Sequence, residues 1–134
     1  ILTTDDVVLE SKLGVLATSV GTSLVEEASK LPFDENTKVN PVINTTSLTT
    51  APFVREVAGV YDDFDDFHNF TDSTIIYSIP FISTCTVTYI TDGNPNGSTN
   101  TKTWHKKLTI RTTTPFSPGD TISLSTIYSY WKFR

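Results

Sequence analysis

The sequence is poor in the residues that usually build disulfides, metal sites and catalytic centres: its 134 residues include one cysteine, two histidines and no methionine. Because Cys85 is alone, neither an internal disulfide nor a Cys-x-x-Cys metal site can form. Its alternating surroundings predict a small buried core residue. His68 and His105 show no His-x-x-x-His spacing, and no GxSxG, P-loop or GxGxxG motif occurs. We therefore expect a protein that is not an enzyme and has no catalytic residues.

Long apolar runs and an excess of basic residues are also missing. No run approaches the roughly 18 residues of a membrane span, and a pI near 4.8 argues against nucleic-acid binding. The net charge of −5 is unevenly spread, since residues 1–75 carry thirteen acidic and four basic side chains whereas residues 76–134 carry two acidic and six basic ones. The two halves are expected to meet electrostatically, either inside one molecule or between neighbours. We predict that Lys106, Lys107 and Arg111 lie on a face distinct from the backbone of the acidic loop. There they would form surface pairs with an acidic surface of the same molecule or of a neighbour.

Residues 3–31 predict one amphipathic helix. Thr3 or Thr4 can cap it, and Pro32 ends it. Apolar residues recur at steps of three and four, a pattern that predicts one face for assembly or for packing on the sheet: Leu9, Leu13, Leu16, Val20, Leu24, Ala28 and Leu31. A second line of small or apolar residues steps by seven and permits close approach of another backbone, either this chain's own sheet or a helix of another subunit: Val7, Gly14, Gly21 and Ala28.

The rest of the chain predicts a connection followed by strands. Residues 32–60 are rich in Pro, Asn and Thr and read as a long loop, with one short strand as an option and a strand or turn at 53–60. Antiparallel strands are expected within residues 75–133, most clearly at 81–90, 104–114 and 121–133, where side chains alternate. The prediction is a single domain over 1–134 of the α+β class, with the long N-terminal helix packed on an antiparallel sheet.

Residues 61–72 form an unusual acidic and aromatic loop, "YDDFDDFHNFTD". Its aromatic residues recur every third position, which favours turns or a short 3₁₀ helix that keeps them on one side. We predict that they form an aromatic clasp directed into the core: Tyr61, Phe64, Phe67 and Phe70. The four aspartates are expected to point to water. The spacing is not that of an EF-hand, so we expect no metal and no cofactor, with Ca²⁺ at these carboxylates as the alternative.

Three segments, taken in order, resemble minor type IV pilins. "SLVEEASKLPFDENT" (23–37) resembles the end of the N-terminal pilin helix. "VYDDFDDFHNF" (60–70) is similar to the "F-D-D-V-D-D-Y-H-G" segment of MSHA-type minor pilins, with Asn69 in place of the glycine. "KKLTIRTTT" and "DTISLSTIYSYW" (106–131) resemble the closing strands of that family.

The resemblance implies a pilin-like ectodomain from which a hydrophobic N-terminal helix half has been removed. It implies a structural subunit, a minor pilin or pseudopilin, of a type IV pilus or type II secretion-like filament. Its partners would be other pilin subunits and, before assembly, the inner membrane, which locates it in the cell envelope, periplasm or cell surface. A secreted adhesin-like module that binds glycan or protein is the alternative, and a small periplasmic hydrolase using His68 or His105 with the aspartates is a third.

Overall fold

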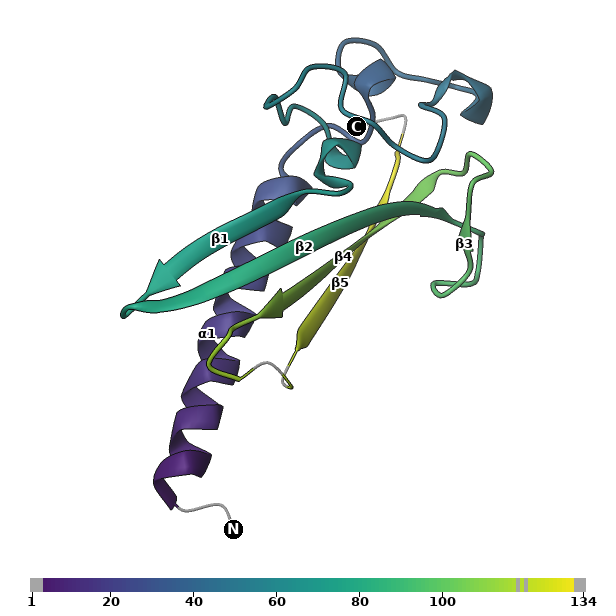
Figure 1. Ribbon diagram of the computed structural model, residues 1–134. Coiled ribbons are helices and arrows are strands. Elements are labelled where there is room, and N and C mark those ends of the chain that lie inside the picture. The colour runs from purple at the N-terminus through teal and green to yellow at the C-terminus, as the bar shows by residue number, and fades with distance from the viewer. Residues whose placement is uncertain (1–3, 118, 120, 132–134) are drawn as a thin grey trace.

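A single long helix leads into the fold. The computed structural model describes residues 4–117, 119 and 121–131, and for residues 4–11 the backbone alone. Helix α1 spans Thr4–Ser29, which confirms the expected helix. Figure 1 shows that it runs along one face of the sheet and that its first turns extend beyond the strands. Thr3 and the side chains of Val7 and Leu9 lie outside the described part.

The sheet is antiparallel and five-stranded, and with α1 it confirms the predicted α+β class. Strands β1, β2, β4 and β5 are neighbours in that order, and β3 pairs with β2. The bounds are Thr71–Ile76 for β1, Ile79–Ile90 for β2, Ser98–Thr99 for β3, His105–Thr113 for β4 and Ile122–Ser129 for β5. The last strand therefore ends before the predicted residue 133, and residues 132 and 133 lie outside the described residues.

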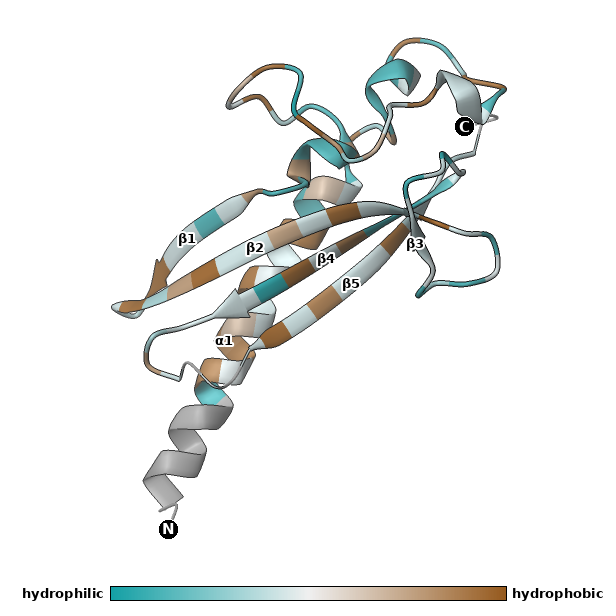
Figure 2. Cartoon of the chain, turned by 45° about the vertical axis from the view of Figure 1, so that its right-hand side comes forward, coloured by the Kyte–Doolittle hydropathy of each residue, from teal (hydrophilic) through white to brown (hydrophobic). Residues whose placement is uncertain are grey.

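Alternation along the central strands separates a buried face from an open one. Hydrophobic and polar residues alternate in colour along β2, β4 and β5 in Figure 2. On β2 the predicted inner face is buried from Phe81 to Tyr89, and Cys85 is buried there as expected. Burial raises the pKa of the Cys85 thiol to about 11, so it stays neutral and unreactive at ordinary pH.

Helix α1 meets this buried face with its predicted stripe. The side chains of Leu13, Val20, Leu24 and Ala28 are buried, and Leu16 packs partly against the same core. These contacts confirm the one-sided burial for the described part of the stripe. Helix and sheet approach closely at Gly21, where an added Cβ would lie 2.7 Å from Leu124 Cδ1. At Gly21 the small residue therefore serves the chain's own sheet, whereas an added Cβ at Gly14 would meet nothing within 4 Å.

The connection between helix and sheet gathers at one end of the molecule. It covers the end where α1 terminates and β5 finishes, opposite the N-terminus (Figure 1). All of residues 32–60 are described, and they contain two short 3₁₀ helices, η1 (Glu35–Thr37) and η2 (Thr45–Ser47), without a strand. The optional strands in this region are therefore wrong; the Pro and Asn residues favour turns over a ladder.

The acidic and aromatic loop contains the expected 3₁₀ piece. Helix η3 spans Phe64–Phe67, and both of these rings are buried. Tyr61 and Phe70 are partly buried against the same core. Ring centroids lie 4.9 Å apart for Tyr61 and Phe70 and 5.5 Å apart for Phe67 and Phe70, in edge-to-face contact. The aromatic clasp thus packs inward as predicted.

Replacing Phe64 should test how much the aromatic clasp contributes. Its ring is 0% exposed and lies 5.1 Å from the Tyr128 ring, so Phe64→Ala leaves a cavity between loop and sheet. We expect a loss of about 3–5 kcal/mol in the free energy of unfolding, measured by urea denaturation. Phe116→Ala, at a ring that is 65% exposed, is the matched control. A loss below about 1 kcal/mol at Phe64 would contradict the clasp.

Candidate functional site: buried carboxylates around Lys106

The aspartates of the loop do not point to water as the sequence suggested. Asp63, Asp65 and Asp66 are 0%, 1% and 0% exposed. The same three-residue turn that directs the aromatic rings inward also turns these carboxylates toward the interior. Asp62 alone stays at the surface, where its carboxylate lies 2.6 Å from Lys38 Nζ.

A reciprocal cap holds two of the buried carboxylates. Asp63 Oδ1 accepts a hydrogen bond from the backbone N–H of Asp66 at 3.1 Å. Asp66 Oδ2 accepts from the backbone N–H groups of Asp62 and Asp63 at 2.9 and 3.2 Å. This is a capping box around η3 with aspartate at both positions. Each carboxylate thus has one oxygen committed to the backbone of its own turn.

Lys106, on strand β4, contacts the third buried carboxylate, that of Asp65. The prediction of a surface position is wrong for this residue: its side chain is fully buried, because alternation along β4 gives it the inward face that Leu108 and Ile110 share. Lys106 Nζ donates to the backbone oxygen of Phe33 at 2.6 Å, to Asp34 Oδ1 at 2.8 Å and to Asp65 Oδ2 at 3.1 Å. Those contacts use all three ammonium donors.

Aromatic rings surround the ammonium on its remaining sides. Lys106 Nζ lies 4.3 Å from the centroid of the Phe33 ring, 5.0 Å from that of Phe53 and 5.5 Å from that of Tyr89. These are cation–π distances, and they strengthen where water is excluded. The charge of Lys106 is therefore stabilised by both carboxylates and ring faces.

Asp34 is the best satisfied carboxylate of the site. In addition to Lys106, it accepts hydrogen bonds from the backbone N–H groups of Asn36 at 3.0 Å and Thr49 at 3.1 Å, and from the Thr49 hydroxyl at 2.9 Å. Burial by itself raises the pKa of Asp34, but the Lys106 charge and these hydrogen bonds outweigh it and hold the pKa below its usual value. Asp34 is therefore ionised in the folded protein.

The pKa values of three other carboxyl groups, Asp63, Asp65 and Glu56, are raised. Burial, and then the neighbouring Asp65, raise the pKa of Asp63 to about 10. Burial also raises the pKa of Asp65, although Lys106 offsets part of this rise. Glu56 lies at the exposed rim, and its pKa is raised to about 7 by lost hydration first and then by Asp66. These carboxyl groups therefore resist ionising together at neutral pH, because Lys106 supplies only one positive charge.

The three segments that resemble pilin motifs meet at this site. Asp34 comes from the first segment, Asp65 from the second and Lys106 from the third, and Lys106 bonds both aspartates. Part of the expected attraction between the acidic first half of the chain and the basic second half is thus satisfied inside the molecule. Lys107 and Arg111 take the outward direction, as expected; Lys107 Nζ donates to the backbone oxygen of Pro95 at 3.2 Å.

His68 fastens the loop to the sheet. Its Nδ1 accepts the backbone N–H of Val87 at 3.0 Å, which requires an unprotonated nitrogen, and burial lowers the pKa of the ring accordingly. The next residue, Asn69, has φ of 62°. Asparagine tolerates this left-handed conformation better than most residues, so it can replace the glycine of the resembling motif.

The structure also aligns a serine, a histidine and an aspartate that the sequence did not suggest. His105 Nδ1 lies 2.6 Å from Ser129 Oγ, and its Nε2 lies 2.8 Å from Asp92 Oδ1. The Asp92 side chain is 82% exposed, so water competes for it and it orients the ring weakly. His105 and His68 are not brought together, and the arrangement supports no catalytic proposal.

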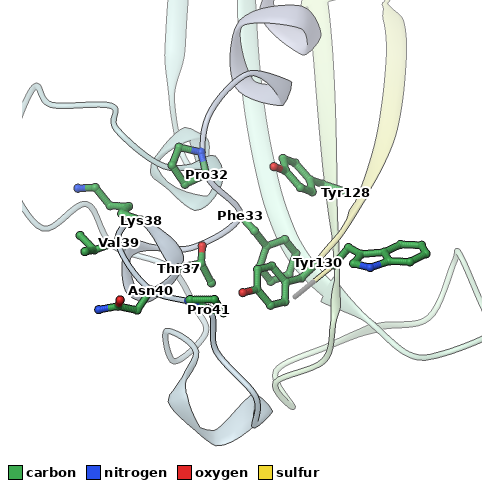
Figure 3. A pocket seen from close by; sticks show the side chains of 10 residues that line it. Pro32, Phe33, Thr37, Lys38, Val39, Asn40, Pro41, Tyr128 and Tyr130 are labelled. Carbon is green, nitrogen blue, oxygen red and sulfur yellow. The ribbon is translucent and has the colours of Figure 1, made fainter. Parts of the chain in front are cut away.

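A shallow pocket of about 280 Å³ lies between the first connection and the end of β5 (Figure 3). Its walls include Lys38, Tyr128 and Tyr130. The Tyr128 hydroxyl donates to the backbone oxygen of Leu31 at 3.1 Å, and the Tyr130 hydroxyl accepts from the N–H of Val42 at 3.0 Å. Both hydroxyl groups thus serve the fold, and Lys38 is paired with Glu35 and Asp62.

Comparison with known proteins identifies no relative: no family model, curated protein or solved structure matches the chain. Among the described residues, no helix is both long and apolar enough to cross a membrane.

Removal of the Lys106 ammonium should destabilise the fold strongly. Lys106→Met keeps the length of the side chain but leaves Asp34 and Asp65 buried without their cation. We expect a loss of about 3–5 kcal/mol in the free energy of unfolding, measured by urea denaturation. Lys107→Met, one residue away with its ammonium near the surface, should cost less than about 1 kcal/mol. Equal losses for the two variants would contradict a special role for Lys106.

Proposed function

We propose that the protein is a non-enzymatic subunit, a minor pilin or pseudopilin, of a type IV pilus or type II secretion-like filament. It would act by packing against other subunits in the cell envelope. The observation that carries the proposal is the long one-sided helix: one face of α1 is buried on the sheet, and its first turns run past the end of the strands (Figure 1).

The free face of α1 has the composition of a packing surface. From Val15, which is 69% exposed, to Ser23 its other exposed positions are short hydroxyl side chains. Exposed charged residues flank this stretch: Lys12, Glu26 and Glu27. The Thr18 hydroxyl donates to the backbone oxygen of Gly14 at 2.8 Å, and that of Ser23 donates to Ser19 at 3.0 Å. Because these hydroxyls bond their own helix, the face can approach another helix without leaving polar groups unpaired.

The site around Lys106 adds a second line of support. The resemblance to minor pilins rests on three separate segments, and a chance resemblance would not require their polar residues to meet. Lys106 nevertheless pairs with both Asp34 and Asp65 in the core. Weak contacts between subunits suffice for such a role, because they are repeated along a filament and a membrane anchor would confine the subunits.

An adhesin-like module that binds glycan or protein is the second candidate. The aromatic wall of the pocket in Figure 3, which includes Tyr128, Tyr130 and Trp131, favours it. Its weakness is that both tyrosine hydroxyls and Lys38 are already engaged within the chain. The gene discriminates between the candidates: a filament subunit requires an apolar segment of roughly 20 residues that continues into Ile1, whereas a secreted module requires a cleavable signal peptide.

A charge on the free face of α1 should block assembly without unfolding the domain. In the full-length subunit, we expect Val15→Asp to reduce recovery in the filament fraction at least tenfold, while the melting temperature of the isolated domain changes little because the side chain is exposed. Val39→Asp is the control, since Val39 is 88% exposed and lies off the helix. Leu16→Asp should also abolish incorporation, but Leu16 packs on the core, so its effect includes destabilisation. Normal incorporation of Val15→Asp would refute the packing role of this face.

A further inference from the structure

Three buried carboxylate oxygens of the loop have no hydrogen-bond partner among the described residues. They are Oδ2 of Asp63, Oδ1 of Asp65 and Oδ1 of Asp66. In each side chain the other oxygen is fixed by the η3 cap or by Lys106. Unpaired buried oxygens are costly, and native interiors contain few of them. Three in one turn therefore require either protons shared between the carboxyl groups or a cation that binds them.

The same three residues converge with a fourth at the surface. Glu56, Asp63, Asp65 and Asp66 each offer one carboxylate oxygen, and these four atoms all lie within 4.8 Å of one another. Oxygens on opposite sides of a Ca²⁺ ion are separated by about twice the metal–oxygen distance of 2.3–2.6 Å. The observed spacing therefore accommodates one ion of that size without rearrangement of the backbone.

Among the described residues, the cations beside this cluster do not balance it. Lys106 has no donor left, because its three N–H groups bond Phe33, Asp34 and Asp65. Arg55 is nearby, but its Nη1 lies 3.5 Å from the backbone oxygen of Asp66, and its Nε is itself without a partner. Neither side chain reaches the three unpaired oxygens.

We propose that Glu56, Asp63, Asp65 and Asp66 bind one Ca²⁺ ion. Four carboxylates supply the oxygen-only ligands that Ca²⁺ prefers, and its variable coordination tolerates side chains already fixed by a cap. Water can complete the shell on the side of Glu56, which is exposed. Mg²⁺ fits less well, since it requires near-ideal octahedral geometry at 2.0–2.1 Å. The ion would tie the turn-rich segment around Glu56 to η3, and this inference is independent of the filament role.

The assignment is tested by calorimetric titration of Ca²⁺ into the chelator-treated protein at pH 7.5. We expect one ion per chain with a dissociation constant on the order of 10⁻⁵ M. At free Ca²⁺ a hundredfold above that constant, the melting temperature should rise by roughly 10 °C. If the carboxyl groups instead share protons and need no metal, Ca²⁺ will leave the melting temperature unchanged. That result, or equal affinity for Mg²⁺, would overturn the proposal.

Variants locate the ion without depending on a fragile core. Glu56→Gln removes the negative charge of an exposed ligand and should weaken Ca²⁺ binding at least tenfold while the protein stays folded. Asp63→Asn keeps the oxygen that accepts from Asp66 and replaces the unpaired one, so it should also weaken binding at least tenfold. Glu27→Gln, on the exposed side of α1, is the charge-matched control and should bind as the parent does. Unchanged affinity in Glu56→Gln would assign the ion elsewhere and refute the site.

Discussion

The Lys106 ammonium, held between Asp34 and Asp65 with Phe33, Phe53 and Tyr89 around it, is the interaction on which the arrangement of the molecule depends. It joins the first connection, the acidic loop and the central strand β4 at one point. A buried ion pair contributes little net stability compared with apolar side chains of the same shape, yet loss of one partner is severe. Its role here is to select one arrangement of these three segments. The connection and the acidic loop are not joined to each other by strand pairing, so the ion pair holds them in place.

The pair also fixes the register of β4. A slip of one residue would bring Lys107 inward and turn Lys106, Leu108 and Ile110 to solvent, and the two buried aspartates would lose their cation. The hydroxyl contact between Ser83 and Thr112, 2.8 Å across β2 and β4, reinforces the same register further along the strands. Polar groups inside this core therefore specify the same alignment as the apolar side chains of β4.

Much of the fold could be predicted because its signals are local. The three-four spacing from Leu13 to Ala28 and the alternation from Phe81 to Tyr89 each lie within one element. Strand β1 was only partly predicted, since its side chains alternate between exposed and half-buried positions and produce a weak apolar pattern. The period-three spacing of Phe64 and Phe67 predicted η3 correctly.

The polar site was missed for a physical reason. Four aspartates in five residues indicate a solvated loop if only neighbours in sequence are considered. Three of them are buried, and the cation that pairs with Asp65 is Lys106, about forty residues away. Alternation along β4 places Lys106 on the inner face with Leu108 and Ile110, but its charge argued for the surface. A lysine at an inward strand position, together with an acidic cluster that lacks nearby cations, was the signal that could have revealed the pairing.

Under the proposed filament role, burial of the acidic cluster and exposure of the helix face have related consequences. One face of helix α1 packs on the sheet, and its other face is exposed and could contact another subunit. The connection over residues 32–70 has little regular structure, and it is positioned by side chains: Asp34, His68 and the aromatic clasp. Weak, repeated contacts select one geometry only if the surfaces on both ends of a subunit are rigidly related. In this protein Lys106 links the connection to the sheet on which α1 lies, and the proposed filament role assigns that constraint to the charged interior. A bound cation at Glu56 would extend the same constraint to the exposed turn beside it.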